Sequence, residues 1–395
     1  MPQRLIHVPL QQIAGILEEI RFALLGGENP PDVPLVEPSL GLIGQALLDR
    51  TFTILTSAFT AVPSAAEVRE AVAEATAARN LFAAEGWLDD PASYHEAPPP
   101  VEASDPEMTW TFDGAGRRRY GHVRFPSGFR PRAGQPGVEA WLAHPTNGTA
   151  HAYVLEHDEP RPWVLCVHGF ATGSALVDFT SFNVRHLHDE LGLNLAFPVL
   201  PLHGPRSTTR FSGSELLSPD YMRLVHLFTQ AVWDVRRVAS WVRSRGATSM
   251  GVYGISLGAY VSSLAVSLCD DFDAVIAGLP PADFVGLAKD NQPWFMRQHE
   301  GDLGPDWQLI RELTRPVSPL ALSPRVPVDR RFLYAGLVDR VVRPHQVRTL
   351  WEHWDRPDIH WFPGGHVLGF WHPSLADFLT RSLSRSGFAS ENPAA

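Results

Sequence analysis

The stretch GVYGISLGAY, residues 251–260, carries the clearest structural signal in the chain. Gly254 and Gly258 bracket Ser256, each two residues away from it. The apolar run SMGVYG before the serine predicts a buried strand, and LGAYVSSLAVSL after it predicts a helix. A Gly-x-Ser-x-Gly pattern at a strand-to-helix junction predicts a turn so sharp that the serine hydroxyl projects above the sheet. Ser256 is therefore the candidate nucleophile.

A serine hydroxyl is a weak nucleophile at neutral pH and needs a base beside it, which an imidazole can supply. Downstream of Ser256, His366 lies in PGGHVLGF, directly after the predicted strand DIHWFP, where two glycines permit an open turn. His372, next to Pro373, is the nearest rival. Other downstream histidines fit packed or solvated positions on a predicted helix or strand: His345, His353 and His360. We predict that His366 is the base.

The base in turn needs a carboxylate that fixes its tautomer and stabilises the imidazolium. Asp339 ends the predicted strand RRFLYAGLVD, one strand–helix unit before His366, and begins the loop DRVVRP. The alternative is that Asp339 caps the next helix, although Pro344 is the stronger helix-start signal there. We predict that Asp339 is the acid.

Negative charge that develops on an attacked carbonyl oxygen needs hydrogen-bond donors placed in advance. One predicted donor is the backbone N–H of Leu257, and the second is the backbone N–H of Phe170 or Ala171 in the loop after the predicted strand RPWVLCV. His168 shapes that loop and is also a candidate for substrate contact. A competing interpretation makes His168 the general base.

The chain from about Met108 to Phe388 resembles the α/β-hydrolase superfamily of esterases, lipases and peptidases. The resemblance rests on four motifs in the order of that family: His168-Gly169-Phe170, Gly254-x-Ser256-x-Gly258, Asp339 and His366. It implies an α/β fold with a mostly parallel, twisted sheet, helices on both faces and a site at the carboxyl ends of the strands. It does not cover the first hundred residues and does not select a substrate.

The predicted organisation has three parts. Residues 1–90 form a helical N-terminal extension, residues 91–106 a Pro-rich linker or surface-hugging connection, and residues 107–390 the catalytic domain. Within the catalytic domain VEAWLA, from Val138, is a strand candidate. Residues 280–326 interrupt the strand–helix alternation. One interpretation is a lid over the site, in which Trp294 contacts the substrate; the other is an ordinary helical insertion whose aromatic residues belong to the core.

Two further features of the sequence raise the question of a binding site. Arg206, in PLHGPRS after the predicted strand LNLAFPV, is a candidate contact for an anionic substrate group, against the alternative that this loop is only a tight turn. His186 and His188 are two residues apart on a predicted helix and point to different faces, so we predict no metal site. No phosphate-binding loop is present, and we expect no cofactor.

Composition narrows the function classes. A net charge of −10 argues against nucleic acid as a partner. Cys166 and Cys269 lie in apolar contexts and predict buried thiols. The N-terminus lacks the pattern of a secretory signal, so we expect a cytoplasmic protein. Residues 40–62 are apolar over a length that could span a membrane, but Asp49 and Arg50 near the middle favour a buried or partner-facing helix over a membrane-surface helix.

The sequence therefore predicts a serine hydrolase, first of all a carboxylesterase, acting on a small-molecule ester by acyl transfer to water. Thioesterase and peptidase activities use the same residues and stay open. A second hypothesis is a non-catalytic scaffold or binding protein whose N-terminal helices recruit a partner. Those helices are also candidates for a homo-oligomer contact or a membrane-surface contact.

Overall fold

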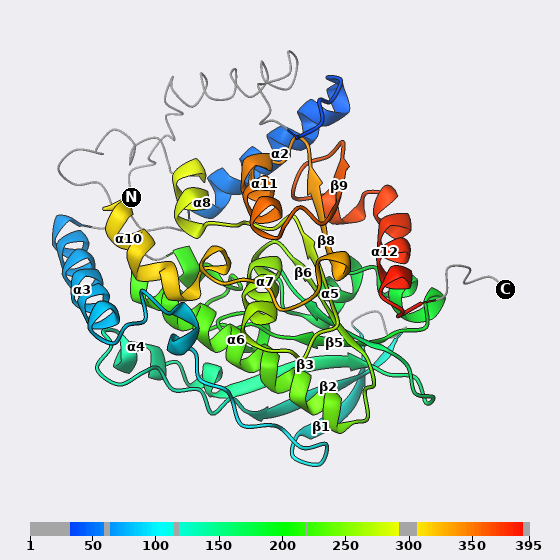
Figure 1. Cartoon of the computed structure of the whole chain (residues 1–395), viewed down its shortest axis with the longest axis horizontal. Helices are drawn as coiled ribbons and strands as arrows, with labels where there is room; N and C mark the ends of the chain where they lie inside the picture. Colours follow the sequence, from blue (N-terminus) through cyan, green and yellow to red (C-terminus); the bar gives the residue numbers. More distant parts are fainter. Residues whose placement is uncertain (1–31, 59–63, 114–117, 218–219, 292–305, 390–395) are drawn as a thin grey trace, which may run out of the picture.

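In the part of the chain that the structure describes, nine strands form one sheet. The computed structural model describes residues 32–58, 64–113, 118–217, 220–291 and 306–389 (Figure 1). The strand order is β1-β2-β3-β5-β4-β6-β7-β8-β9. The bounds are β1 Glu107–Phe112, β2 Arg119–Pro126, β3 Thr149–Leu155, β4 Trp163–Val167, β5 Asn194–Pro198, β6 Met250–Ile255, β7 Ala274–Gly278, β8 Arg331–Gly336 and β9 Asp358–Phe362. Strands β1, β2, β3 and β5 pair antiparallel, and every pairing from β5 through β4 to β9 is parallel.

Helices cover both faces of this sheet. Their bounds are α2 Leu40–Ala58, α3 Ala65–Ala84, α4 Val138–Leu142, α5 Ala175–Ser181, α6 Tyr221–Ser244, α7 Leu257–Leu268, α8 Phe284–Asn291, α10 Trp307–Thr314, α11 Pro344–His353 and α12 Ser374–Arg385. The central strand shows why two layers form, because successive side chains of a strand point to opposite faces. Leu165 and Val167 of β4 join the core that holds α6 and α7. Val164 and Cys166 join the core that holds α5 and α12. The predicted α/β fold with helices on both faces is confirmed.

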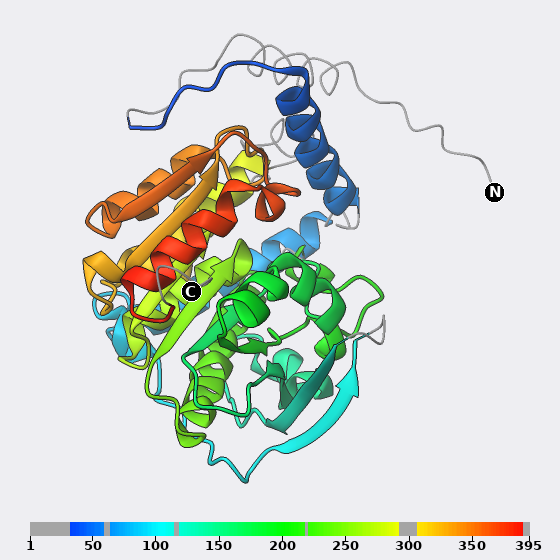
Figure 2. The same cartoon turned by 90° about the vertical axis from the view of Figure 1, so that its right-hand side faces the viewer.

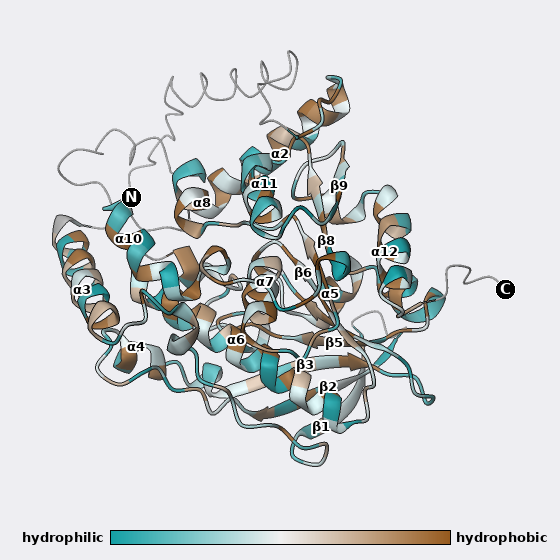
Figure 3. Ribbon diagram, viewed as in Figure 1, coloured by the Kyte–Doolittle hydropathy of each residue, from teal (hydrophilic) through white to brown (hydrophobic). Residues whose placement is uncertain are grey.

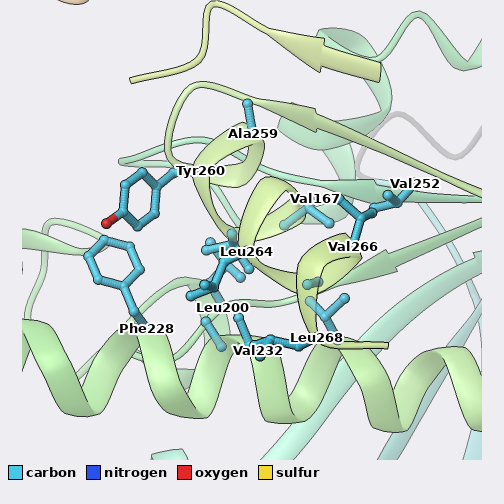
Figure 4. Packing of buried hydrophobic residues seen from close by; sticks show 14 of the residues in the cluster. Val167, Leu200, Phe228, Val232, Val252, Ala259, Tyr260, Leu264, Val266 and Leu268 are labelled. Atoms are coloured by element: carbon cyan, nitrogen blue, oxygen red, sulfur yellow. The ribbon is translucent and has the colours of Figure 1, made fainter. Parts of the chain in front are cut away.

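The larger core lies between the sheet and the α6–α7 layer. Figure 4 shows Phe228 of α6 beside Tyr260 of α7, with ring centroids 4.5 Å apart. The Tyr260 hydroxyl donates to the backbone oxygen of Val317 at 2.9 Å. Figure 3 colours each residue by hydropathy: the hydrophobic residues, in brown, include the central strands, and hydrophilic residues, in teal, lie on the outer helices. The helix that follows Ser256 is therefore packed on every side, which gives the turn before it a rigid support.

Among the described residues, the α-helices α2 and α3 precede the sheet in the chain. Helix α3 begins with a capping box, because Ser64 Oγ accepts from the N–H of Glu67 and the Glu67 carboxylate accepts from the N–H of Ser64. Its buried Phe82 packs on Trp87 and on Tyr94 of the Pro-rich segment. The N–H of Val101 in that segment donates to Ser240 Oγ of α6 at 2.9 Å. Tyr94 and Val101 thus fix the Pro-rich segment to α3 and to α6.

One element differs from its prediction. Residues 138–142 form the short helix α4 and not a strand. The segment VEAWL has a single polar residue, Glu139, and is too short to distinguish the period of a strand from that of a helix. Trp141 is buried near α6, where its Nε1–H donates to Gln230 at 2.8 Å. Both cysteines are buried free thiols, as predicted. Over the described ranges, no helix has both the length and the apolar character needed to cross a membrane.

Candidate active site

The turn at Ser256 has the strained backbone that the sequence predicts. Ser256 has φ +55° and ψ −117°, outside the regions that residues with a side chain usually adopt. Its N–H donates to the Gly278 oxygen at 2.8 Å, which continues the β6–β7 pairing. A Cβ at Gly258 would lie 1.9 Å from the Val167 oxygen, and one at Gly254 would lie 2.3 Å from the Gly258 oxygen. The glycines therefore let β4, β6 and α7 meet at this point without a side chain between them.

His366 connects Ser256 to Asp339. His366 Nε2 lies 3.0 Å from Ser256 Oγ, and His366 Nδ1 lies 2.7 Å from Asp339 Oδ2. The three residues follow β6, β9 and β8, whose carboxyl ends meet at one edge of the sheet because these strands are parallel. The other oxygen of Asp339 accepts from the N–H groups of Val341 and Val342 at 2.8 and 2.7 Å. The carboxylate is thus held in one orientation, with one oxygen left for the imidazole.

The charges around His366 favour its protonated form. Burial of the ring disfavours the imidazolium, but the neighbouring carboxylates of Asp339 and Asp49 outweigh this effect, so the pKa of His366 lies above its ordinary value. The ring is therefore a stronger base than a free imidazole. Such an arrangement can accept a proton from Ser256 and stabilise the resulting cation.

The loop after β4 lies directly against the serine. An added Cβ at Gly169 would be 3.4 Å from the Ile255 oxygen and 3.6 Å from Ser256 Cβ, so this backbone already touches the turn. Leu257 is the first residue of α7, where backbone N–H groups lack an acceptor within the helix. Phe170 and Leu257 both line the cavity next to Ser256. Their assignment to an oxyanion hole stays a prediction.

His168 holds this loop in place through its ring. His168 Nε2 accepts from the N–H of Leu200 at 3.0 Å, while Nδ1 lies 2.8 Å from the Gly169 oxygen and 3.1 Å from Thr172 Oγ1. Burial and the neighbouring His203 lower the pKa of His168 to about 3, so the ring is neutral. Although His168 borders the cavity, both ring nitrogens are already used inside the chain. We therefore assign it to the architecture of the loop and not to substrate binding or to base catalysis.

The predicted substrate contact by Arg206 is wrong. Its side chain is 0% exposed and forms an ion pair with Asp234, with Nη1 2.8 Å from Oδ2. It also donates to the backbone oxygens of Val199 and Asn147, both at 2.9 Å. The guanidinium thus fastens the loop after β5 to α6 and cannot reach a substrate. Trp294, the remaining predicted contact, lies outside the described residues.

A cavity of about 760 Å³ opens beside Ser256 and His366. Its wall is mainly apolar and comes from the loop after β4, α5, the loop after β9 and both described parts of the 280–326 segment. The apolar side chains include Phe170, Leu176, Val177, Leu216, Phe284, Leu287, Trp307, Phe370 and Trp371. Whether residues 280–326 act as a lid stays a prediction. A few polar groups within an apolar wall are typical of a site for a small ligand with a large apolar part.

Helix α2 contributes residues that sequence reasoning did not assign to the site. Phe52, Thr53 and Thr56 line the cavity, and Asp49 contacts the loop of His366. Asp49 is 1% exposed. The sequence does contain a signal, because a charged residue in the middle of an apolar helix needs a specific partner when it is buried. The pattern alone does not say which partner that is.

Fold and site together define the class. The chain has the α/β-hydrolase fold, with the turn at Ser256 after β6, and Asp339 and His366 after β8 and β9. Among solved structures, acetyl xylan esterase 1 from Thermoanaerobacterium sp. JW/SL YS485 aligns with a TM-score of 0.53 at 15% identity, over 76% of this chain and 93% of that one. An acetyl xylan esterase from Paenibacillus sp. R4 aligns with a TM-score of 0.51 at 13% identity, over 75% and 98%.

The particular family is shown by sequence. Two uncharacterised proteins of Mycobacterium tuberculosis, MT2702 and Rv2627c, are each 37% identical to this chain over 363 residues, which cover 91% of this chain and 86% of theirs. The chain belongs to the family of these two proteins. No protein-family model matches it.

Proposed function

We propose that this protein is a serine hydrolase that cleaves carboxylic esters with apolar acyl groups through an acyl-enzyme intermediate. The observation that carries the proposal is the pair of short contacts from Ser256 to His366 and from His366 to Asp339, placed at the wall of an apolar cavity. The strained serine backbone supports it further, since strain of this kind is concentrated at functional sites. The two acetyl xylan esterases share the fold, which fits hydrolysis of an ester but does not name the substrate.

Each residue has one role in the proposed reaction. Ser256 Oγ attacks the ester carbonyl carbon while His366 Nε2 takes the hydroxyl proton. The N–H groups of Leu257 and Phe170 stabilise the oxyanion until the alcohol leaves with the proton from His366. A water molecule then attacks the acyl-enzyme and gives a proton to His366, which returns it to Ser256 as the carboxylic acid departs. Asp339 orients the imidazole and stabilises its cation in both halves.

The cavity favours an apolar acyl group over a peptide or a sugar. Burial of one methylene contributes about 0.8 kcal/mol, whereas an unpaired polar group in an apolar wall is unfavourable. We therefore place carboxylesterase activity first. A thioester of the same acyl group fits the same wall and differs only in its leaving group, so it is the second candidate.

The test is hydrolysis of p-nitrophenyl esters from acetyl to palmitoyl by the wild type, Ser256→Ala and a matched control, Ser262→Ala. Ser262 lies on the same helix and is buried away from the reacting atoms. We expect Ser256→Ala to lose activity by several orders of magnitude and Ser262→Ala to retain it. Equal rates for wild type and Ser256→Ala would remove Ser256 as the nucleophile. No hydrolysis by either protein would favour a narrow substrate or the binding-protein hypothesis. Faster hydrolysis of acyl-CoA thioesters than of oxygen esters would reassign the leaving group.

A further inference from the structure

The N-terminal helix α2 reaches the two loops that carry the acid and the base. Asp49 Oδ2 accepts from the backbone N–H of His366 at 2.7 Å and from that of Arg340 at 3.0 Å. Asp49 Oδ1 accepts from the N–H of Val367 at 2.9 Å. Figure 1 and Figure 2 show α2, in dark blue, beside the orange and red segments that include these loops. One side chain therefore ties the backbone next to Asp339 to the backbone of His366 itself.

The neighbours of Asp49 on α2 make the same contact wider. Gln45, one helical turn earlier on the same face, accepts from the N–H of Gly365 at 3.0 Å through Oε1. Leu42 and Ala46 pack on Val338, which lies just before the acid. The helix thus docks through polar contacts to the histidine loop and apolar contacts to the acid loop.

The fit between Asp49 and the histidine loop leaves no space for a side chain. A Cβ at Gly365 would lie 2.8 Å from Asp49 Oδ2. The glycine beside His366 thus lets the carboxylate approach the loop backbone closely enough to accept from two successive N–H groups. The loop conformation and the position of Asp49 therefore depend on each other.

Asp49 is held where its charge is unfavourable. Burial and the nearby Asp339 raise the pKa of Asp49 to about 6, and His366 and the backbone N–H groups counteract part of this rise. The ionisable groups that face it from the two loops are Asp339 and His366, and Arg340 meets it through its backbone N–H. A neutral residue would avoid the burial of a charge, so the carboxylate has a use other than stability.

We propose that Asp49 is a positioning residue for catalysis, which fixes the backbone of His366 relative to Asp339 and adds a second negative charge behind the imidazole. This inference rests on the proposed function, because it assigns Asp49 to the same serine hydrolase site. It makes helix α2 part of the active site, together with Phe52 and Thr56 in the cavity wall.

The test compares Asp49→Asn with Asp329→Asn in the full chain. Asp329 is exposed and lies before β8, at the end opposite to Asp339, so its substitution removes the same charge away from the site. Asparagine can still accept from the His366 and Arg340 N–H groups through one oxygen, but its amide nitrogen cannot accept from Val367. With p-nitrophenyl butyrate we expect Asp49→Asn to lower kcat about 10- to 100-fold with KM changed less than about twofold, as for a small misplacement of a catalytic group.

A pH profile separates positioning from a general loss of structure. Because the charge of Asp49 raises the pKa of His366, Asp49→Asn should move the acid limb of kcat/KM to lower pH. Asp329→Asn should leave kcat and the acid limb at their wild-type values. Thermal unfolding should show Asp49→Asn at least as stable as the wild type at pH 8.

Other outcomes have distinct meanings. Wild-type kcat and an unshifted acid limb in Asp49→Asn would overturn the inference. So would a rate loss that matches a loss of folded protein, measured as the fraction of chains that a fluorophosphonate probe labels at Ser256 once labelling has gone to completion. Failure of the proposed function is recognised separately, because Ser256→Ala would then be as active as the wild type, whatever Asp49→Asn does.

Discussion

Arg206 and Asp234 form an ion pair from which water is excluded, with Nη1 2.8 Å from Oδ2. The Asp234 carboxylate also accepts from Ser127 Oγ at 2.6 Å, and the Arg206 guanidinium donates to the backbone oxygen of Asn147. The pair therefore joins α6 to the loop after β5 and to the chain between β2 and β3. Because the pair is buried, its contribution to the free energy of unfolding differs from that of a surface ion pair.

We expect Arg206→Met to lower the free energy of unfolding by about 3–5 kcal/mol, because it leaves the Asp234 carboxylate buried without its cation. Urea denaturation measures the effect. The control is Arg161→Met, which breaks the exposed pair with Glu159 and should cost at most about 1 kcal/mol. Equal effects of the two substitutions would show that the buried pair has no special weight.

The activity should depend on pH through His366. The ring must be neutral to accept the serine proton, and its pKa lies above the ordinary value because two carboxylates outweigh burial. The acid limb of kcat/KM for an ester should therefore have its midpoint above pH 6.5. A midpoint below 6.5, measured with a substrate that does not itself titrate there, would contradict this electrostatic picture.

The stability of the protein should depend on pH through Asp49. Its pKa is about 6 in the folded chain and 3.8 in the reference state, so it stabilises the fold below pH 3.8 and this contribution is lost as pH rises through 6. A shift of this size corresponds to roughly 3 kcal/mol. Asp49→Asn should therefore become more stable relative to the wild type as the pH rises from 4 to 8, apart from about 1 kcal/mol for the lost hydrogen bond. If the free energies of unfolding of Asp49→Asn and the wild type changed in parallel between pH 4 and 8, the pKa of Asp49 would not be raised.

The cavity wall should set the acyl length. Ala288 of α8 lines the cavity, and Ala288→Phe narrows it. We expect kcat/KM to fall by about fourfold for each methylene that no longer fits, so long-chain esters lose more than acetate. Ala83→Phe makes the same change at an exposed position of α3 and should leave the chain-length profile unaltered. A uniform loss across all chain lengths in Ala288→Phe would mean that α8 does not border the acyl group.

The sequence predicts the fold and the positions of the three central residues because their signals are local. Ser256, Asp339 and His366 each follow a recognisable apolar strand, and the carboxyl ends of neighbouring parallel strands must meet at one edge. The role of Arg206 could not be predicted in this way, since its ion pair depends on where α6 lies above the loop after β5. Asp49 shows the same limit more strongly. A charge in an apolar helix indicates a buried partner, but the partner is 317 residues away and is a backbone N–H, which every segment offers.

The separation between Asp49 and His366 affects how the protein folds during synthesis. Translation produces α2 long before the loop of His366, so the contact between them joins segments that are 317 residues apart. A nascent or prematurely ended chain can contain Ser256 and its complete turn and still lack the groups that Asp49 binds. If Asp49 acts as proposed, hydrolytic activity therefore arises only after β9 has joined the sheet and α2 has docked beside it.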